Sequence, residues 1–224
     1  MRLRKGHDVG STFKLCSLLL CYPDEQLLAA RAGLAAAAAQ VTPRAAAEPL
    51  ERFCAWWGMQ QPLALQQHYV ETFDLDKRCG LYLTFYGEGD KRGRGAALLR
   101  LKRMYRAAGL PLEGSELPDY LPVMLEFAAD AADRQGEIVL REHRAALELL
   151  RGSLHQHETP YAAVLDTVCV AAGEPSVADR ARAVKLAAAG PPSEQVGLEP
   201  LLTEAMMPPV LTTPQGRPVS EARR

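Results

Sequence analysis

The sequence predicts an all-α fold: a single helical bundle of about seven to nine helices, with a flexible C-terminal tail. Apolar residues recur with the helical period along most of the 224 residues. No alternating pattern typical of a β-strand extends beyond a few residues. Proline and glycine stand between the periodic segments, at places where helices end. Together these observations indicate one helical bundle.

The first four helices are expected over residues 11–39, 45–58, 63–79 and 92–108. Pro43 and Pro62 separate the first three, because proline cannot continue a helix. Gly109 follows the fourth, at the position of a left-handed cap. The apolar run near the N-terminus is followed by Pro23 and acids, without a small-residue cleavage site. We therefore expect a mature amphipathic helix and not a signal peptide.

The last four helices are expected over residues 119–133, 137–155, 161–172 and 176–188. Asp119 is the expected N-cap of the first of these. Pro122 then stands in its first turn, where a missing N–H costs little. Pro160 and Pro175 separate the others. We expect residues 1–189 to form the all-α domain.

Residues 190–224 are rich in proline and lack a helical repeat. This composition predicts a disordered tail. The alternative is that Leu201, Leu202, Met206 and Met207 dock on the domain as a short turn.

Composition excludes several classes of protein. The 48% hydrophobic and 24% charged content is that of a soluble globular protein. A net charge of −1 argues against nucleic acid as a partner, and no segment has transmembrane length. The five cysteines are scattered and odd in number, which indicates free thiols in a reducing cytoplasm.

Residues 69–112 combine aromatics, glycines and both signs of charge, a mixture that a core helix pair does not need. Tyr82, Phe85 and Tyr86 lead directly into a Gly-x-Gly turn, and a helix with a basic polar side follows. We interpret this segment as part of a surface that holds another molecule.

The basic helix is followed by an acidic stripe, if the next helix is continuous. The stripe comprises Asp119, Glu126, Asp130, Asp133 and Glu137. Like charges at i,i+4 cost roughly 0.2–0.5 kcal/mol per pair, so the stripe suggests a basic partner. That partner is either the chain's own basic helix or a cationic segment of another protein.

We expect neither a catalytic nor a metal site. The Gly87–Gly89 turn is acidic, which does not suit phosphate. His155 and His157 point to different faces of a helix and have no acid or cysteine at ligand spacing. Cys79 follows two basic residues, but no recognisable motif supplies a histidine, so core packing is favoured over a nucleophilic role.

Two segments carry a family resemblance: YVETFDLDKRCGLYLTFYGEGDKRGRG, and ELPDYLPVMLEF at residues 116–127. They resemble the NarJ branch of the TorD/DmsD family of molybdoenzyme assembly chaperones. The resemblance implies an all-α cytoplasmic protein with no enzymatic activity, no cofactor of its own and no direct membrane insertion. Tyr120 stands where the family often has histidine, so any proton-switch role of that histidine is not carried over.

The implied client is the apo form of the nitrate reductase alpha subunit (NarG-like), chiefly its N-terminal segment, which forms an amphipathic helix. The chaperone would hold this subunit while bis-molybdopterin guanine dinucleotide and an iron–sulfur cluster are inserted, and would prevent premature docking to the membrane anchor. Molybdenum cofactor biosynthesis proteins are further candidate partners.

We expect the client helix to lie in a groove. Its apolar anchors would meet Tyr82, Phe85 and Tyr86 with Leu121 or Met124, and its basic residues would meet Glu71, Asp74, Glu88, Asp119 and Glu126. The alternative for Phe85 and Leu121 is that they are ordinary core residues. Arg92 and Arg94 are expected either to orient these acids or to touch a ligand.

Rival functions are a same-fold chaperone for a dimethyl sulfoxide reductase or formate dehydrogenase, and a small helical enzyme or nucleotide-binding module.

Overall fold

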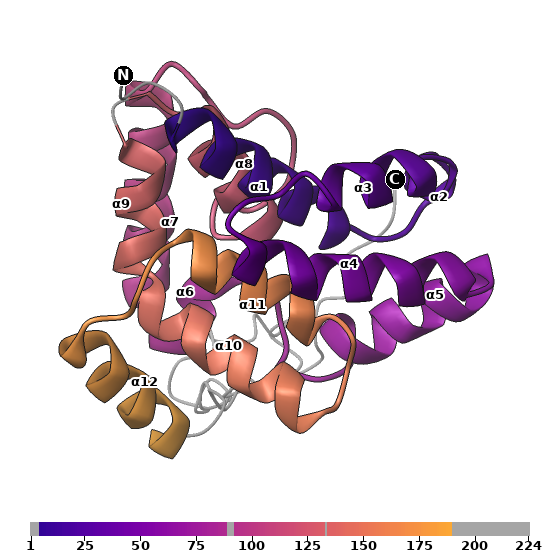
Figure 1. Cartoon of the computed structure of the whole chain (residues 1–224). Coiled ribbons are helices and arrows are strands. Elements are labelled where there is room, and N and C mark those ends of the chain that lie inside the picture. The colour runs from indigo at the N-terminus through magenta and orange to yellow at the C-terminus, as the bar shows by residue number, and fades with distance from the viewer. Residues whose placement is uncertain (1–4, 89–91, 133, 190–224) are drawn as a thin grey trace, which may run out of the picture. The chain divides into compact units, whose positions relative to one another are not determined.

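The computed structural model describes residues 5–88, 92–132 and 134–189, without the side chains of residues 5–8, 88, 92 and 189. This part is helical, as predicted, and its only β element is an isolated bridge between Tyr82 and Tyr120 (Figure 1). The predicted tail, residues 190–224, lies outside the described residues.

The N-terminal half of the described chain contains six α-helices and a π-helix. They are α1 (Lys5–Leu19), α2 (Glu25–Ala29), α3 (Arg31–Ala38), α4 (Arg44–Met59), α5 (Pro62–Tyr69), the π-helix η1 (Val70–Asp74) and α6 (Leu83–Glu88). The predicted helix over residues 11–39 is therefore three helices. It breaks at Pro23, and Asp24 then caps α2 by accepting a 2.8 Å hydrogen bond from the Leu27 amide.

Six further helices make up the C-terminal half of the described chain. They are α7 (Arg92–Ala107), α8 (Leu121–Asp130), α9 (Gln135–Glu142), α10 (Arg144–Gln156), α11 (Ala162–Ala171) and α12 (Val177–Ala189). Gly109 follows α7 with a φ of 77°, as expected of a left-handed cap. The predicted helix over residues 137–155 is divided at His143 into α9 and α10.

The predicted helix over residues 119–133 is shorter at both ends. Tyr120 occupies the N-cap position of α8, with Pro122 in the first turn, so the prediction that Asp119 is the cap was wrong. The helix ends at Asp130, and Arg134 has a left-handed φ of 61° before α9 begins. The acidic stripe is consequently not one continuous helix face, and Asp133 lies outside the described residues.

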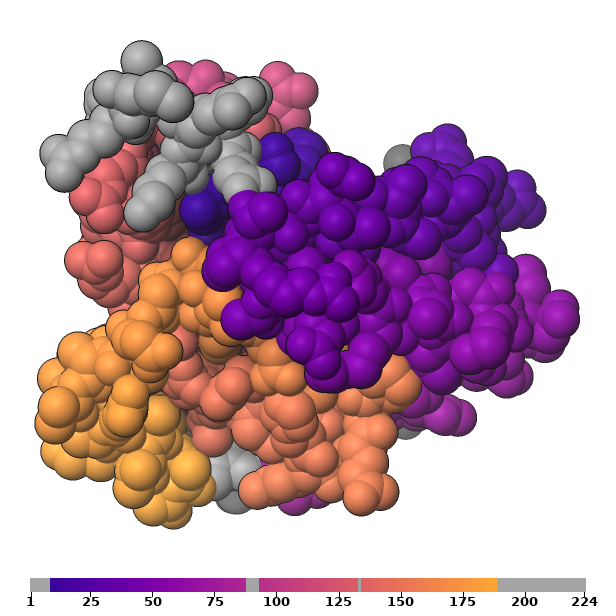
Figure 2. All heavy atoms as spheres, in the orientation of Figure 1, coloured from indigo at the N-terminus to yellow at the C-terminus, as the bar shows by residue number. Residues whose placement is uncertain are grey.

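The core is built around α1, α4, α8 and α11. Helix α1 packs against α8 and α11, and its apolar side, including Phe13, Cys16 and Leu19, is buried. Helix α11 packs between α4 and α10 (Figure 1). Helix α12 packs against α10 and forms a ridge at the lower left of Figure 2.

Two glycines permit close helix contacts. A Cβ atom at Gly136 of α9 would lie 2.2 Å from the Ala128 Cα, and one at Gly10 of α1 would lie 2.9 Å from the Ala129 carbonyl oxygen. Real Cβ atoms do not approach backbone so closely. Glycine at these positions therefore lets α1 and α9 rest directly on the backbone of α8.

All five cysteines are free thiols, as expected, and four of them are buried. Burial raises the pKa of Cys54 and of Cys79 to about 11 each. No helix among the described residues is both long and apolar enough to span a bilayer.

Candidate functional site

A pocket of about 210 Å³ lies where four separate parts of the chain meet. Its lining is mostly aromatic, with two acids: Tyr22, Tyr69, Phe73, Asp74, Leu81, Tyr82, Glu116 and Tyr120. We call it the tyrosine–carboxylate pocket. Tyr22 is 45% exposed and Asp74 is also exposed, so the pocket is open to solvent.

One wall of the pocket is fixed by the β-bridge. The Leu83 amide donates a 3.0 Å hydrogen bond to the Asp119 carbonyl oxygen, and the Leu121 amide donates a 2.8 Å bond to the Leu81 carbonyl oxygen. These bonds hold Tyr82 opposite Tyr120, with ring centroids 5.3 Å apart and an interplanar angle of 35°. Two rings from distant segments thus form one aromatic surface.

The floor of the pocket comes from the π-helix. Its wider turn directly continues α5, and such turns often occur at functional sites. It buries Phe73, whose ring centroid lies 4.9 Å from that of Tyr69, and leaves Asp74 exposed beside them. The Tyr69 hydroxyl donates a 3.0 Å hydrogen bond to the Leu20 carbonyl oxygen and lies 3.0 Å from the Tyr120 hydroxyl.

Glu116 supplies the second carboxylate. It accepts hydrogen bonds from the Tyr82 hydroxyl at 3.1 Å and from the Leu117 amide at 2.8 Å, which orient it at the pocket. Burial, and next the charge of Glu116, raise the pKa of Tyr82 to about 12. Burial also raises the pKa of Tyr120. Tyr82 and Tyr120 are therefore neutral at physiological pH, and the pocket combines aromatic faces with carboxylates, which suits an ammonium or guanidinium group.

A second hollow, the α7–α8 cleft, has a volume of about 320 Å³. Its lining is apolar with an acidic rim: Tyr105, Leu110, Pro111, Leu112, Glu113, Val123, Glu126, Phe127 and Asp130. The loop between α7 and α8 lines both hollows, since Glu113 lies in the cleft and Glu116 in the pocket. An elongated ligand could contact both along this loop.

The rim of the cleft is partly neutralised from within the protein. Lys14 of α1 pairs with Glu126 and lies 3.5 Å from Asp130, and the hydrogen bond to Glu126 raises the pKa of Lys14. The basic helix α7 instead directs Arg94 toward Asp119 and Arg100 toward Glu142. The internal partner of Glu126 is therefore Lys14 and not the basic helix.

Asp119 lies in the interior, which corrects its expected place on an exposed face. Its side chain is 0% exposed and accepts hydrogen bonds from the Thr84 hydroxyl at 2.5 Å and the Thr84 amide at 3.3 Å. The Arg94 guanidinium lies 3.6 Å from this carboxylate and 5.8 Å from the centre of the Phe85 ring. In this structure Asp119 joins α6 and α7 to the start of α8 and does not face solvent.

Several other expected contact residues are also placed in the core. Leu121 and Met124 are 0% exposed, and the Tyr86 hydroxyl donates hydrogen bonds to the Arg78 and Gly80 carbonyl oxygens. Phe85 is half-buried, whereas Glu71 and Glu126 are exposed. The side chains of Glu88 and Arg92 lie outside the described residues. Of the expected set, Asp74 and Tyr82 line the pocket, and Glu126 lines the cleft.

Of the eight residues that line the pocket, the sequence predicted only Asp74 and Tyr82 and missed the other six: Tyr22, Tyr69, Phe73, Leu81, Glu116 and Tyr120. Glu116 and Tyr120 belong to the ELPDY element, in which the predicted contact residue was Asp119, the neighbour of Tyr120. Tyr22 lay within a predicted helix, and only the break at Pro23 brings it to the pocket.

No motif predicted a histidine beside Cys79, but the fold places one there. His157, just beyond α10, lies beside Cys79 and Asp76, whereas His155 instead pairs with Asp166. Burial raises the pKa of Cys79 to about 11, so the thiol stays protonated at neutral pH, and this argues against a nucleophile.

Residues 36–166 match the nitrate reductase delta subunit family. The chain is 38% identical over 165 residues to the probable nitrate reductase molybdenum cofactor assembly chaperone NarJ of Bacillus subtilis, covering 73% of this chain and 89% of that protein. It is 34% identical over 154 residues to the NarJ chaperone of Escherichia coli K12, covering 68% and 65% respectively.

A solved structure supports the fold. A redox enzyme maturation protein from Archaeoglobus fulgidus aligns with a TM-score of 0.51 and 24% identity, covering 80% of this chain and 93% of that one. At this identity the likeness concerns the fold alone.

Proposed function

Because the chain belongs to the nitrate reductase delta subunit family, we propose that it is a non-enzymatic assembly chaperone whose client is the apo catalytic alpha subunit of a nitrate reductase. The relatives from Bacillus subtilis and Escherichia coli carry the name of nitrate reductase molybdenum cofactor assembly chaperone. The chain covers 89% of the Bacillus subtilis protein, which supports the same role here.

The proposed binding mode rests on the tyrosine–carboxylate pocket. We assign it to a basic side chain of the client's N-terminal segment, which would lie over the aromatic surface formed by Tyr82 and Tyr120 and meet Asp74 and Glu116. A cation over an aromatic face contributes about 0.5–2 kcal/mol, depending on desolvation. Charge-assisted hydrogen bonds to the carboxylates add to this and provide the preference for a cation.

The α7–α8 cleft supports the second half of the proposal. An amphipathic client helix would place apolar anchors against Leu112, Val123 and Phe127, following the helix-in-groove mode. Leu112 and Val123 are half-buried and Phe127 is 5% exposed, and together they take the role first expected of Leu121 and Met124, which are 0% exposed. Glu126 and Asp130 at the rim then face the polar side of the client.

In this proposal the chaperone contributes binding and no chemistry. Occupying the client's N-terminal segment keeps the apo subunit from docking to its membrane anchor. The molybdenum cofactor and the iron–sulfur cluster are cargo of the client, inserted while the complex persists.

Calorimetric titration with the synthetic N-terminal peptide of the alpha subunit tests the proposal. Glu116→Gln should weaken binding about tenfold, equivalent to about 1.4 kcal/mol, and should reduce its salt sensitivity. Glu174→Gln is the matched control, because the Glu174 side chain is 93% exposed and lies outside the pocket lining. This variant should bind the peptide as the unmodified protein does. Unchanged affinity and salt dependence in Glu116→Gln would exclude the pocket.

The same titration identifies the client. Peptides from the N-termini of a dimethyl sulfoxide reductase and a formate dehydrogenase should bind more weakly than the nitrate reductase peptide. Tighter binding of either would transfer the proposal to that molybdoenzyme and leave the pocket assignment intact.

A further inference from the structure

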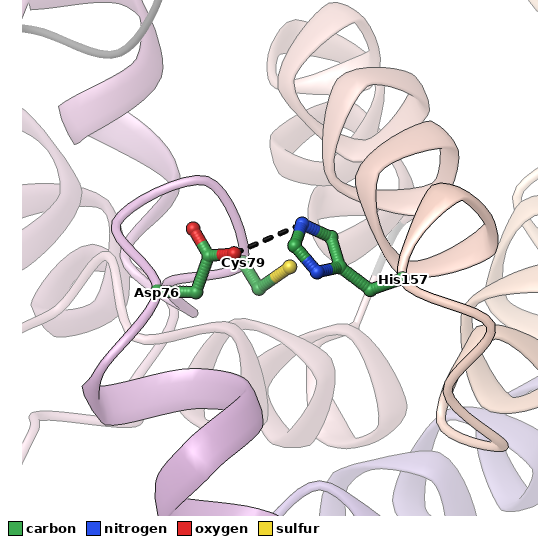
Figure 3. A group of neighbouring side chains, drawn as sticks. All are labelled: Asp76, Cys79 and His157. Atoms are coloured by element: carbon green, nitrogen blue, oxygen red, sulfur yellow. Dashed lines mark ion pairs between the residues drawn. The ribbon is translucent and has the colours of Figure 1, made fainter.

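Three side chains that commonly bind metals meet outside the proposed client site. Asp76 and Cys79 lie in the turn between η1 and α6, and His157 lies just beyond the last residue of α10 (Figure 3). One ligand atom from each residue lies within 4.8 Å of the others. Cys79 is buried, whereas Asp76 is half-buried and His157 exposed, so the group spans from the core to the solvent.

We propose that Asp76, Cys79 and His157 bind a divalent transition-metal ion of the zinc class. Thiolate sulfur, imidazole nitrogen and carboxylate oxygen are the three ligand types that zinc uses in proteins. Hard cations such as Mg²⁺ and Ca²⁺ prefer all-oxygen sites, so the thiol and imidazole favour a softer ion. Three protein ligands leave a fourth tetrahedral position for water.

The geometry requires only side-chain adjustment. Zinc–ligand distances of about 2.0–2.3 Å place tetrahedral ligand atoms about 3.3–3.8 Å apart. The Asp76 Oδ2 to His157 Nε2 distance is 2.9 Å, so these atoms need to separate by less than about 1 Å. The adjoining cavity, of about 170 Å³, is lined by all three residues and leaves room for this change.

The backbone around the ligands is already fixed. The Cys79 amide donates a 2.9 Å hydrogen bond to the Asp76 carbonyl oxygen, and the Arg78 amide donates a 2.9 Å bond to Asp76 Oδ1. The Tyr86 hydroxyl donates to the carbonyl oxygens of Arg78 and Gly80 at 3.0 and 2.8 Å. Asp76 and Cys79 thus stand on a turn held by these hydrogen bonds, as a preorganised site requires.

Binding would release the proton of the Cys79 thiol, because cysteine binds zinc as the thiolate. The ion would join the turn before α6 to the end of α10. Since the chain continues from this turn through Leu81 into Tyr82, metal binding would stabilise the segment that leads to the tyrosine–carboxylate pocket. The inference does not depend on the identity of the client.

The direct test is titration of tag-free protein, reduced with a phosphine, with Co²⁺ and Zn²⁺. Co²⁺ should give a sulfur-to-cobalt charge-transfer band together with tetrahedral ligand-field bands, and Zn²⁺ should abolish both. Equilibrium dialysis with Zn²⁺ should give one ion per chain, and the melting temperature should rise with Zn²⁺ concentration.

Variants locate the site. His157→Asn, at an exposed residue, and Cys79→Ala should each weaken Zn²⁺ binding by at least about tenfold, and Cys79→Ala should remove the charge-transfer band. His155→Asn and Cys21→Ser supply the matched controls and should leave binding unchanged. If His157→Asn binds Zn²⁺ as tightly as the unmodified protein, or if no charge-transfer band forms, the three residues are only an ion pair beside a core thiol.

Discussion

Tyr82 and Tyr120 are held together both by their backbones, through an antiparallel bridge, and by their side chains, whose ring centroids lie 5.3 Å apart. This contact joins the segment before α6 to the segment before α8. Asp74, at the end of η1, and Glu116, in the loop before α8, line the same pocket as these rings. The bridge therefore joins Tyr82 and the ELPDY element in one aromatic surface.

Asp119 supports that surface from the interior, and its removal should destabilise the fold. Asp119→Ala deletes the acceptor of the Thr84 hydroxyl and the carboxylate that Arg94 faces. Breaking a buried charged contact costs about 3 kcal/mol. Urea unfolding followed by circular dichroism should show this loss. Glu126→Gln, at a side chain 54% exposed, is the control and should change stability by less than about 1 kcal/mol. Equal stability of the two variants would contradict the structural role of Asp119.

Gly136 should tolerate no side chain. In Gly136→Ala the new Cβ would lie 2.2 Å from the Ala128 Cα, so α9 has to move away from α8. Overpacking of this kind costs about 1–3 kcal/mol. Gly152→Ala in α10 meets nothing within 4 Å and should stabilise the protein by about 0.5–1 kcal/mol through its helix propensity. Thermal unfolding of the pair measures both effects, and a neutral Gly136→Ala would refute the close contact.

Stability should decrease on mild acidification because of two histidines. Burial lowers the pKa of His68 and of His143 below the ordinary value of about 6.5. As the pH falls below that value, the unfolded chain takes up protons that the native protein excludes, so the free energy of unfolding falls. Above it, both states are deprotonated and the contribution is constant. His68→Gln and His143→Gln should each make this slope shallower between about pH 7 and 5.5. An unchanged slope in both would show that neither histidine titrates differently on unfolding.

Lys14 should compete with a basic client for the rim of the cleft. Lys14→Gln removes the cation that pairs with Glu126 and Asp130 and so makes the rim more acidic. Peptide affinity should rise by about two- to fivefold at low salt, with the gain lost at high salt. Lys77→Gln, another exposed lysine that lies outside the cleft lining, should not have this effect. Weaker binding by Lys14→Gln would mean that Lys14 itself contacts the client.

The helical period was sufficient to predict the fold class and most helices, because apolar spacing reports directly on which face is buried. It missed α6, whose six residues are too few to show a period, and the break after Asp130, where Arg134 adopts a left-handed conformation. Neither proline nor glycine marks this break in the sequence.

The site was harder to predict because it is assembled from distant segments. Asp119 has the local signals of a capping acid, yet its burial against Thr84 depends on the bridge to another segment. The group of Asp76, Cys79 and His157 has no recognisable ligand spacing, since the histidine comes from the end of α10. Burial and long-range contacts are properties of the fold and are not visible in local sequence.

The central claim is that the tyrosine–carboxylate pocket receives the client's N-terminal segment, and photo-cross-linking tests it most directly. A benzophenone amino acid at Tyr22, which is 45% exposed at the pocket, would be irradiated in the complex with the apo alpha subunit. The same group at Met59, which is 74% exposed outside the pocket lining, is the control. Mass spectrometry should find cross-links from position 22 to the first residues of the client and none from position 59. Cross-links from position 22 confined to other parts of the client, or absent in a complex that still forms, would contradict the claim.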